Sequence, residues 1–148
     1  MGFVRVAGGY VAAVIALGFA ATVLSSVMVL AMLEAVGAEI GAGQAMSQIG
    51  YDLAGFAPLY SALIAVALAA AFIAAALVTR VLRPLRPVVF AAAGAVAMGV
   101  MLTLMEQVFF GVQLVAGART TAGFLAQVGA GAVAGLIYAV LTPGPKRS

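Results

Sequence analysis

The sequence predicts an all-α polytopic membrane protein, a single domain built as a four-transmembrane-helix bundle with both termini in the cytoplasm. Three observations support this fold class: an apolar composition, four long stretches without charge, and a strong bias of the basic residues toward one side. Hydrophobic residues occupy 66% of the 148 positions and charged residues 7%, against about 45–50% and about 25% in soluble domains. So few charges cannot coat a water-soluble domain, and most of the surface must face lipid.

Four stretches of the chain are long enough to cross a bilayer, because a hydrocarbon core about 30 Å thick requires about 20 apolar residues of helix. Charged residues are absent from residues 6–33, 53–79, 87–105 and 120–145. The predicted transmembrane helices cover residues 7–33, 56–79, 88–111 and 121–141. Their apolar residues run continuously instead of alternating, which argues against the strands of a β-barrel.

The basic residues indicate which side of the membrane each connection occupies. Six of the seven precede the first helix, join the second helix to the third, or follow the fourth: Arg5, Arg80, Arg83, Arg86, Lys146 and Arg147. Four crossings place these segments on one side, and the positive-inside rule makes that side cytoplasmic. The remaining charged residues lie at or beyond the outer face: Glu34, Glu39, Asp52, Glu106 and Arg119.

The cytoplasmic connection between the second and third helices holds Arg80, Arg83 and Arg86 together with Pro84 and Pro87. Proline interrupts a helix but suits its first position, so we predict a tight antiparallel hairpin here. We interpret the three arginines as a stop-transfer signal. The alternative is a patch that binds anionic lipid or the acidic loop of a partner.

The outer connection, residues 34–55, is the longest segment outside the predicted helices. Its apolar residues Ala42, Ala45, Met46, Ile49 and Leu53 recur at helical spacing, which predicts a short amphipathic helix lying on the outer leaflet. Four glycines within residues 37–50 disfavour a helix. An irregular loop covering the bundle is therefore the alternative.

Small residues dominate the predicted helices, since alanine and glycine together fill 53 of the 148 positions. Such residues let helix backbones approach closely in lipid, where association depends on van der Waals contact. In the fourth helix Gly131, Gly135 and Ala139 form a stripe at spacing i, i+4, i+8, and Gly99 lies on a similar stripe of the third. We predict that these stripes pack within the bundle; the alternative is contact with a second copy or a partner helix.

Three charged residues near the outer face are the candidate site. Glu106 lies 18 residues beyond Val88, roughly 27 Å along a helix and so near the outer boundary of the membrane. Arg119 directly precedes the fourth helix, with Asp52 and Glu106 available as counterions. We predict a bidentate ion pair that ties the outer loop to the fourth helix. The alternative is an outer-mouth site for anions, lipid headgroups, protons or cations.

The absence of histidine and cysteine excludes thiolate nucleophiles, imidazole bases and metal sites built on those ligands. We expect no catalytic residues, no cofactor and no bound metal. Methionines recur at helical spacing in two helices, at Met28 and Met32 and at Met98, Met101 and Met105. This arrangement suits Cu(I), but we interpret it as flexible filling of the core.

Three short segments suggest a family: AGGY at 7–10, YDLAGFAPLY at 51–60 and ART at 118–120. Together they resemble uncharacterised four-helix proteins of bacterial inner membranes. The resemblance implies the same location and a role for Asp52 and Arg119. It implies no activity.

The function we expect is that of a small accessory, assembly or scaffold subunit that packs against other integral membrane proteins or against itself. This expectation follows from the small-residue faces, the lack of a soluble domain and the scarcity of polar residues within the helices. The expected partners are lipids and membrane proteins, and not nucleic acid. One alternative is a small oligomeric transporter or channel with an acidic outer mouth; another is a lipid, quinone or pigment binder.

Overall fold

The computed structural model describes residues 2–108 and 115–142 and confirms the all-α fold class. The fold is 90% helical, and the described residues include four helices that are long and apolar enough to cross a membrane. These helices are α1 (Gly2–Ala35), α3 (Ala57–Val78), α4 (Arg86–Val108) and α5 (Thr121–Leu141). The bounds of α5 coincide with the predicted range 121–141, whereas α1 extends beyond 7–33 in both directions.

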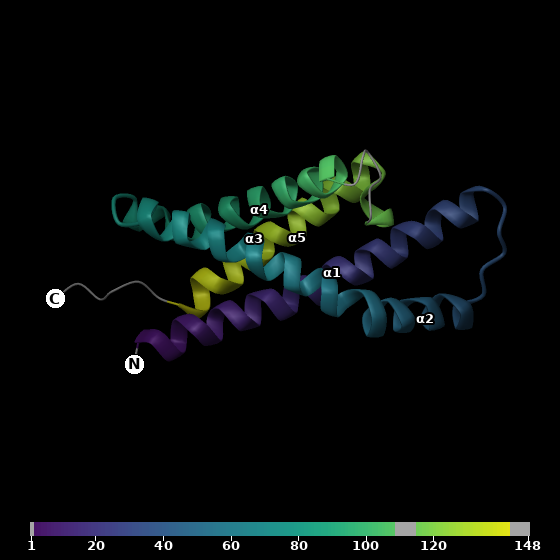
Figure 1. Ribbon diagram of the computed structural model, residues 1–148, viewed down its shortest axis with the longest axis horizontal. Helices are drawn as coiled ribbons and strands as arrows, with labels where there is room; N and C mark the ends of the chain where they lie inside the picture. The colour runs from purple at the N-terminus through teal and green to yellow at the C-terminus, as the bar shows by residue number, and fades with distance from the viewer. Residues whose placement is uncertain (1, 109–114, 143–148) are drawn as a thin grey trace.

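The four long helices alternate in direction and form a bundle in which each packs against two others (Figure 1). Contacts join α1 to α3, α3 to α4, α4 to α5 and α5 back to α1. The start of α1, the end of α5 and the short helix η2 (Arg83–Leu85) lie at one end of this bundle. We name the end that holds η2 the terminal end of the bundle, and the opposite end the far end.

The core of the bundle is apolar and contains an aromatic cluster in its terminal half. Phe72 of α3 stacks on Tyr138 of α5 with ring centroids 4.5 Å apart, and it meets Phe90 of α4 edge-on at 5.5 Å. Fully buried aliphatic side chains from three helices extend the core toward the far end: Leu17, Ile64, Leu68 and Met98. Met98 and Met101 are therefore part of the core packing, as we interpreted them from the sequence.

Helices α4 and α5 meet through glycine. A side chain on Gly131 would overlap the carbonyl oxygen of Gly94, and one on Gly135 would overlap that of Phe90. Gly99, in contrast, is half-buried, and an added Cβ would lie 3.7 Å from the nearest side chain, an ordinary contact. The tight glycine contact of α4 is therefore made by Gly94, which does not belong to the predicted stripe that contains Gly99.

The amphipathic segment forms a helix, α2 (Ala42–Tyr51), but α2 continues without a break into α3. A π-helical turn, η1 (Asp52–Phe56), connects the two, and the N–H of Ala57 donates to the carbonyl of Asp52. The wider turn has a local cause, because the ring of Pro58 would clash with the carbonyl of Ala54 in a regular helix. The segment predicted to lie on the membrane surface is thus the first part of a longer helix.

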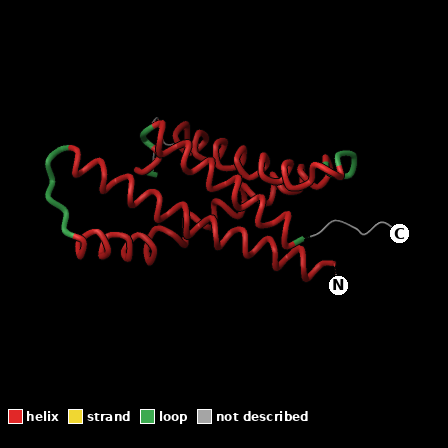
Figure 2. The backbone as a smooth tube through the Cα atoms, turned by 180° about the vertical axis from the view of Figure 1, so that it is seen from behind, coloured by secondary structure: helices red, strands yellow, loops and turns green. Residues whose placement is uncertain are grey.

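Two of the helical segments are longer than a bilayer core is thick. The 34 residues of α1 and the 37 residues of Ala42–Val78 span roughly 51 Å and 55 Å, against about 30 Å of hydrocarbon. The excess lies at the far end, where the last buried residue of α1 is Ser26 and α2 has none. Residues 27–51 form a helical hairpin that projects from the bundle (Figure 2).

Candidate functional site

Asp52, a predicted site residue, lies where the projecting hairpin joins the bundle. Its side chain accepts two hydrogen bonds, one from Ser26 Oγ of α1 at 2.6 Å and one from Gln48 Nε2 of α2 at 3.1 Å. Ser26 is buried and Asp52 is half-buried. A carboxylate that accepts from two helices holds them together, so Asp52 fixes the position of the hairpin.

We expect the substitution Asp52→Asn to loosen the hairpin without unfolding the bundle. The asparagine amide nitrogen cannot accept the Ser26 hydroxyl proton, and a charged hydrogen bond becomes neutral, which costs about 1–2 kcal/mol locally. Hydrogen exchange of residues 42–51 should accelerate about tenfold. Glu39→Gln, an exposed change in the same hairpin, should leave the exchange rate unaltered. Equal rates in both variants would contradict the anchoring role.

Glu106 and Arg119, the other predicted site residues, also lie at the far end. Glu106 is half-buried near the end of α4, and Arg119 is exposed between the short 3-10 helix η3 (Ala116–Ala118) and α5. The hydrogen-bond donors to Asp52 that the described residues provide are Ser26 and Gln48. An ion pair between Arg119 and Glu106 stays a prediction.

The segment that leads into α5 is tied to α1 by a different group. The N–H of Gly117 donates to the hydroxyl of Ser25 at 3.2 Å, and a Cβ at Gly117 would overlap the backbone of Ser25. Thr120 then caps α5 by accepting the N–H of Gly123 at 3.0 Å. Ser25 thus joins the far end of α1 to the start of α5, a contact that we did not predict from the sequence.

A buried glutamine links three helices below these contacts. Gln127 of α5 is 1% exposed; its Nε2 donates to the carbonyl of Ala21 in α1 at 2.8 Å. Its Oε1 lies 3.4 Å from the hydroxyl of the buried Tyr60 in α3. Gln127 is absent from the site residues predicted from the sequence. The available signal was a single glutamine inside the fourth charge-free stretch.

The polar residues do not form a path across the bundle. The polar residues of the far half, Thr22, Ser25, Ser26 and Gln127, give way to the fully buried Leu17, Ile64 and Leu68 and then to the aromatic cluster. Beside these apolar residues the hydroxyl of Tyr10 in α1 donates to the carbonyl of Ala65 in α3, and at the terminal end Arg86 binds α5. Within the described residues this arrangement does not favour a transport pathway.

At the terminal end, the three arginines of the basic connection have different environments. Arg80 and Arg83 are exposed, whereas Arg86 is half-buried. Its Nη1 donates to the carbonyl of Ala139 at 2.7 Å and its Nη2 to the hydroxyl of Thr142 at 2.9 Å. Arg86 therefore closes the C-terminal end of α5, a role that the stop-transfer interpretation does not include.

A groove with a volume of 1020 Å³ lies between the far halves of α3 and α4. We name it the α3–α4 groove. Its lining extends from Phe56, the last residue of η1, along α3 to Ala71, and along α4 from Val96 to Val108. The lining is almost wholly apolar; alanines contribute at four positions, Ala67, Ala70, Ala71 and Ala97, and the one tyrosine is Tyr60.

Comparison of the chain with protein-family models, with curated proteins and with solved structures finds no match. The resemblance to bacterial inner-membrane proteins therefore stays a prediction.

Proposed function

We propose that this protein is a small, non-enzymatic accessory subunit that receives a transmembrane helix of another integral membrane protein in the α3–α4 groove. The groove is the observation that carries the proposal. We further propose a bacterial inner membrane as its location, with both termini cytoplasmic. The orientation rests on Arg5, Arg80, Arg83 and Arg86, which lie at the terminal end, while all four acids lie toward the far end.

The dimensions of the groove suit a helix. From Val96 to Val108 it is lined over 12 residue steps of α4, about 18 Å along the axis. A helix about 10 Å in diameter fills roughly 1400 Å³ over that length, so a groove of 1020 Å³ would enclose much of it. The remainder would face lipid, as expected for a helix bound at the side of a bundle.

The composition of the groove also favours a helix. Its four alanines present methyl groups where larger residues would keep a partner backbone away, the pattern that permits close helix contact in lipid. Gly131 and Gly135 are already used against α4. The alanines of the groove are a separate set: Ala70 is exposed, Ala67 and Ala71 are half-buried, and Ala97 is buried.

We expect Ala70→Phe to abolish binding of the partner and to leave the bundle intact, because the added ring would fill the groove. The matched control is Ala62→Phe, an exposed alanine of the same helix that does not line the groove. A photo-reactive residue placed at position 70 or 62 in native membranes identifies what lies against each surface. Co-purification of the protein cross-linked from position 70 is then measured for both phenylalanine variants.

The outcomes separate the alternatives. The proposal is supported if position 70 cross-links to a different membrane protein, and if that protein co-purifies with Ala62→Phe but not with Ala70→Phe. Adducts with a second copy would replace it with a homo-oligomer. Adducts with lipid alone, or equal loss in both variants, would refute it.

A lipid, quinone or pigment binder is the second candidate, and Phe56 is the observation that favours it. Its half-buried ring lines the groove and packs on the fully buried ring of Tyr60, with centroids 4.9 Å apart, so it offers a stacking surface to a planar ligand. Native mass spectrometry of the protein purified in mild detergent tests this candidate. A retained planar ligand that is lost in Phe56→Leu would favour it over the partner helix.

A further inference from the structure

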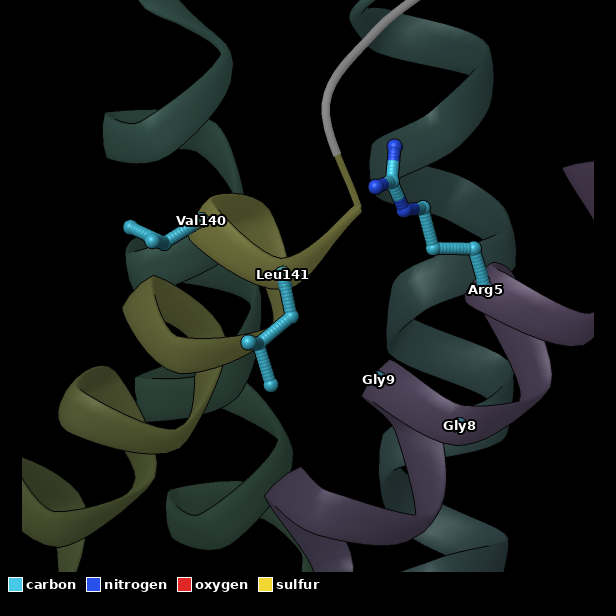
Figure 3. Close-up of a pocket in the computed structure, with 5 residues that line it drawn as sticks. All are labelled: Arg5, Gly8, Gly9, Val140 and Leu141. Atoms are coloured by element: carbon cyan, nitrogen blue, oxygen red, sulfur yellow. The ribbon is translucent and has the colours of Figure 1, made fainter.

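A second hollow lies at the terminal end, between the start of α1 and the end of α5. Its volume is 550 Å³, and it is lined by Arg5, Gly8, Gly9, Val140 and Leu141. Figure 3 shows Arg5 on α1 and Leu141 on α5 at opposite sides of this hollow, with the two glycines on the α1 side. We name it the Arg5 pocket.

The two glycines have different roles in shaping the pocket. A Cβ at Gly9 would lie 2.7 Å from Cγ2 of Thr142, so glycine is needed for α1 to approach the end of α5. A Cβ at Gly8 would meet nothing within 4 Å. Packing therefore does not require glycine at position 8; its absent side chain leaves the pocket open.

The charge of the pocket is positive, and no acidic side chain among residues 2–108 and 115–142 lies at this end of the bundle. Within the described residues Arg5 makes no hydrogen bond or ion pair with another side chain, and it is exposed. A second cation lies close by, because Thr142, which touches Gly9, accepts a hydrogen bond from Arg86. All four acids of the chain lie toward the far end.

The other wall of the pocket is apolar and open to lipid. Val140 is 73% exposed and Leu141 45% exposed, and both lie on the last turn of α5. A ligand that fits both walls carries an anionic group for the guanidinium and a hydrocarbon portion for the valine and leucine. An anionic phospholipid has both, and a free phosphate ion has only the first.

We propose that the Arg5 pocket binds the phosphate-bearing headgroup of an anionic phospholipid. The guanidinium of Arg5 donates to the phosphate oxygens, since arginine matches phosphate geometry with two parallel N–H donors. The space above Gly8 receives the headgroup, and an acyl chain descends along Val140 and Leu141. This site is independent of the α3–α4 groove and of any partner bound there.

The test compares lipid retention by the purified full chain in a neutral detergent, measured by native mass spectrometry with phosphatidylglycerol and phosphatidylcholine added in equal amounts. We expect the wild type to retain phosphatidylglycerol about tenfold over phosphatidylcholine. Arg5→Gln and Gly8→Leu should each abolish that preference. The controls are Arg83→Gln, an exposed arginine at the same end, and Gly129→Leu, where a Cβ also meets nothing within 4 Å; both should keep the preference.

Each other outcome overturns the proposal. Equal losses in Arg5→Gln and Arg83→Gln would show attraction to the whole basic surface without a site. Competition by millimolar inorganic phosphate would identify a site for free anions. Circular dichroism establishes that each variant is folded. If Gly8→Leu does not fold, Gly8→Ala replaces it, because it adds a single methyl group to the same space. An unchanged lipid preference in Arg5→Gln refutes the site whatever the result at position 8.

Discussion

Replacement of Gly135 with leucine is expected to separate α4 from α5 and to prevent the bundle from folding correctly. The first carbon of the new side chain would overlap the carbonyl oxygen of Phe90, and its nearest neighbours include the backbone of Ala91. A backbone cannot move aside as a flexible side chain can, so the helices must part along their whole contact. Overpacking costs about 1–3 kcal/mol where side chains can yield, and we expect at least about 3 kcal/mol here.

The same helix provides the control. A Cβ added at Gly129 would meet nothing within 4 Å, so Gly129→Leu changes volume and helix propensity to the same extent without a clash. Thermal unfolding followed by circular dichroism in mild detergent measures both variants against the wild type. A Gly135→Leu protein as stable as Gly129→Leu would mean that α4 and α5 are not in glycine-mediated contact.

The glycine stripe illustrates how far sequence reasoning reaches for this bundle. Spacing alone indicates that Gly131, Gly135 and Ala139 share one face of α5, because the helical period fixes that relationship. Spacing cannot tell which face of α4 lies opposite. That choice depends on the rotation of the helix about its axis, and in a helix with small residues all round, Gly94 and Gly99 are equally plausible from the sequence.

The polar contacts were harder to predict for a related reason. Asp52 stands out because charge is rare in the chain, and its position at the far end followed from counting residues. Its partner Ser26 and the buried Gln127 are uncharged residues within apolar stretches, where nothing in the local pattern distinguishes a buried hydrogen bond from a lipid-facing one. Pairing across 26 residues between Ser26 and Asp52, or 106 between Ala21 and Gln127, is a property of the tertiary fold.

The continuity of α2 with α3 was hidden by opposing local signals. Pro58 and the glycines Gly50 and Gly55 all suggest a break between the two helices. The sequence therefore predicted a short helix separate from the transmembrane helix that follows it. The π-helical turn resolves the conflict by accommodating proline without ending the helix. It also places Asp52 at its first residue, so the irregular turn and the anchoring carboxylate are one structural feature.

Substitution of Arg86 by methionine is expected to be the second most damaging change, and it acts at the opposite end of α5. The last carbonyls of a helix have no partner within the helix, and here the guanidinium binds that of Ala139 directly. It also donates to Thr142, whose hydroxyl in turn donates to the carbonyl of Tyr138 at 2.6 Å. One side chain thus satisfies the end of α5 both directly and through a relay.

The expected loss for Arg86→Met is about 2–3 kcal/mol, since a hydrogen bond to a charged group contributes about 1.5–3 kcal/mol. The guanidinium also lies 5.0 Å from the centroid of the Phe90 ring, and this cation–π contact adds to the loss. Arg83→Met, in the exposed part of the same connection, should change stability by less than about 0.5 kcal/mol. Denaturation in mixed detergent measures the stability of both variants, and hydrogen exchange should show that the loss in Arg86→Met is concentrated in the last turn of α5. Equal loss of stability in the two variants would show that Arg86 contributes only positive charge at this end and no specific contact with α5.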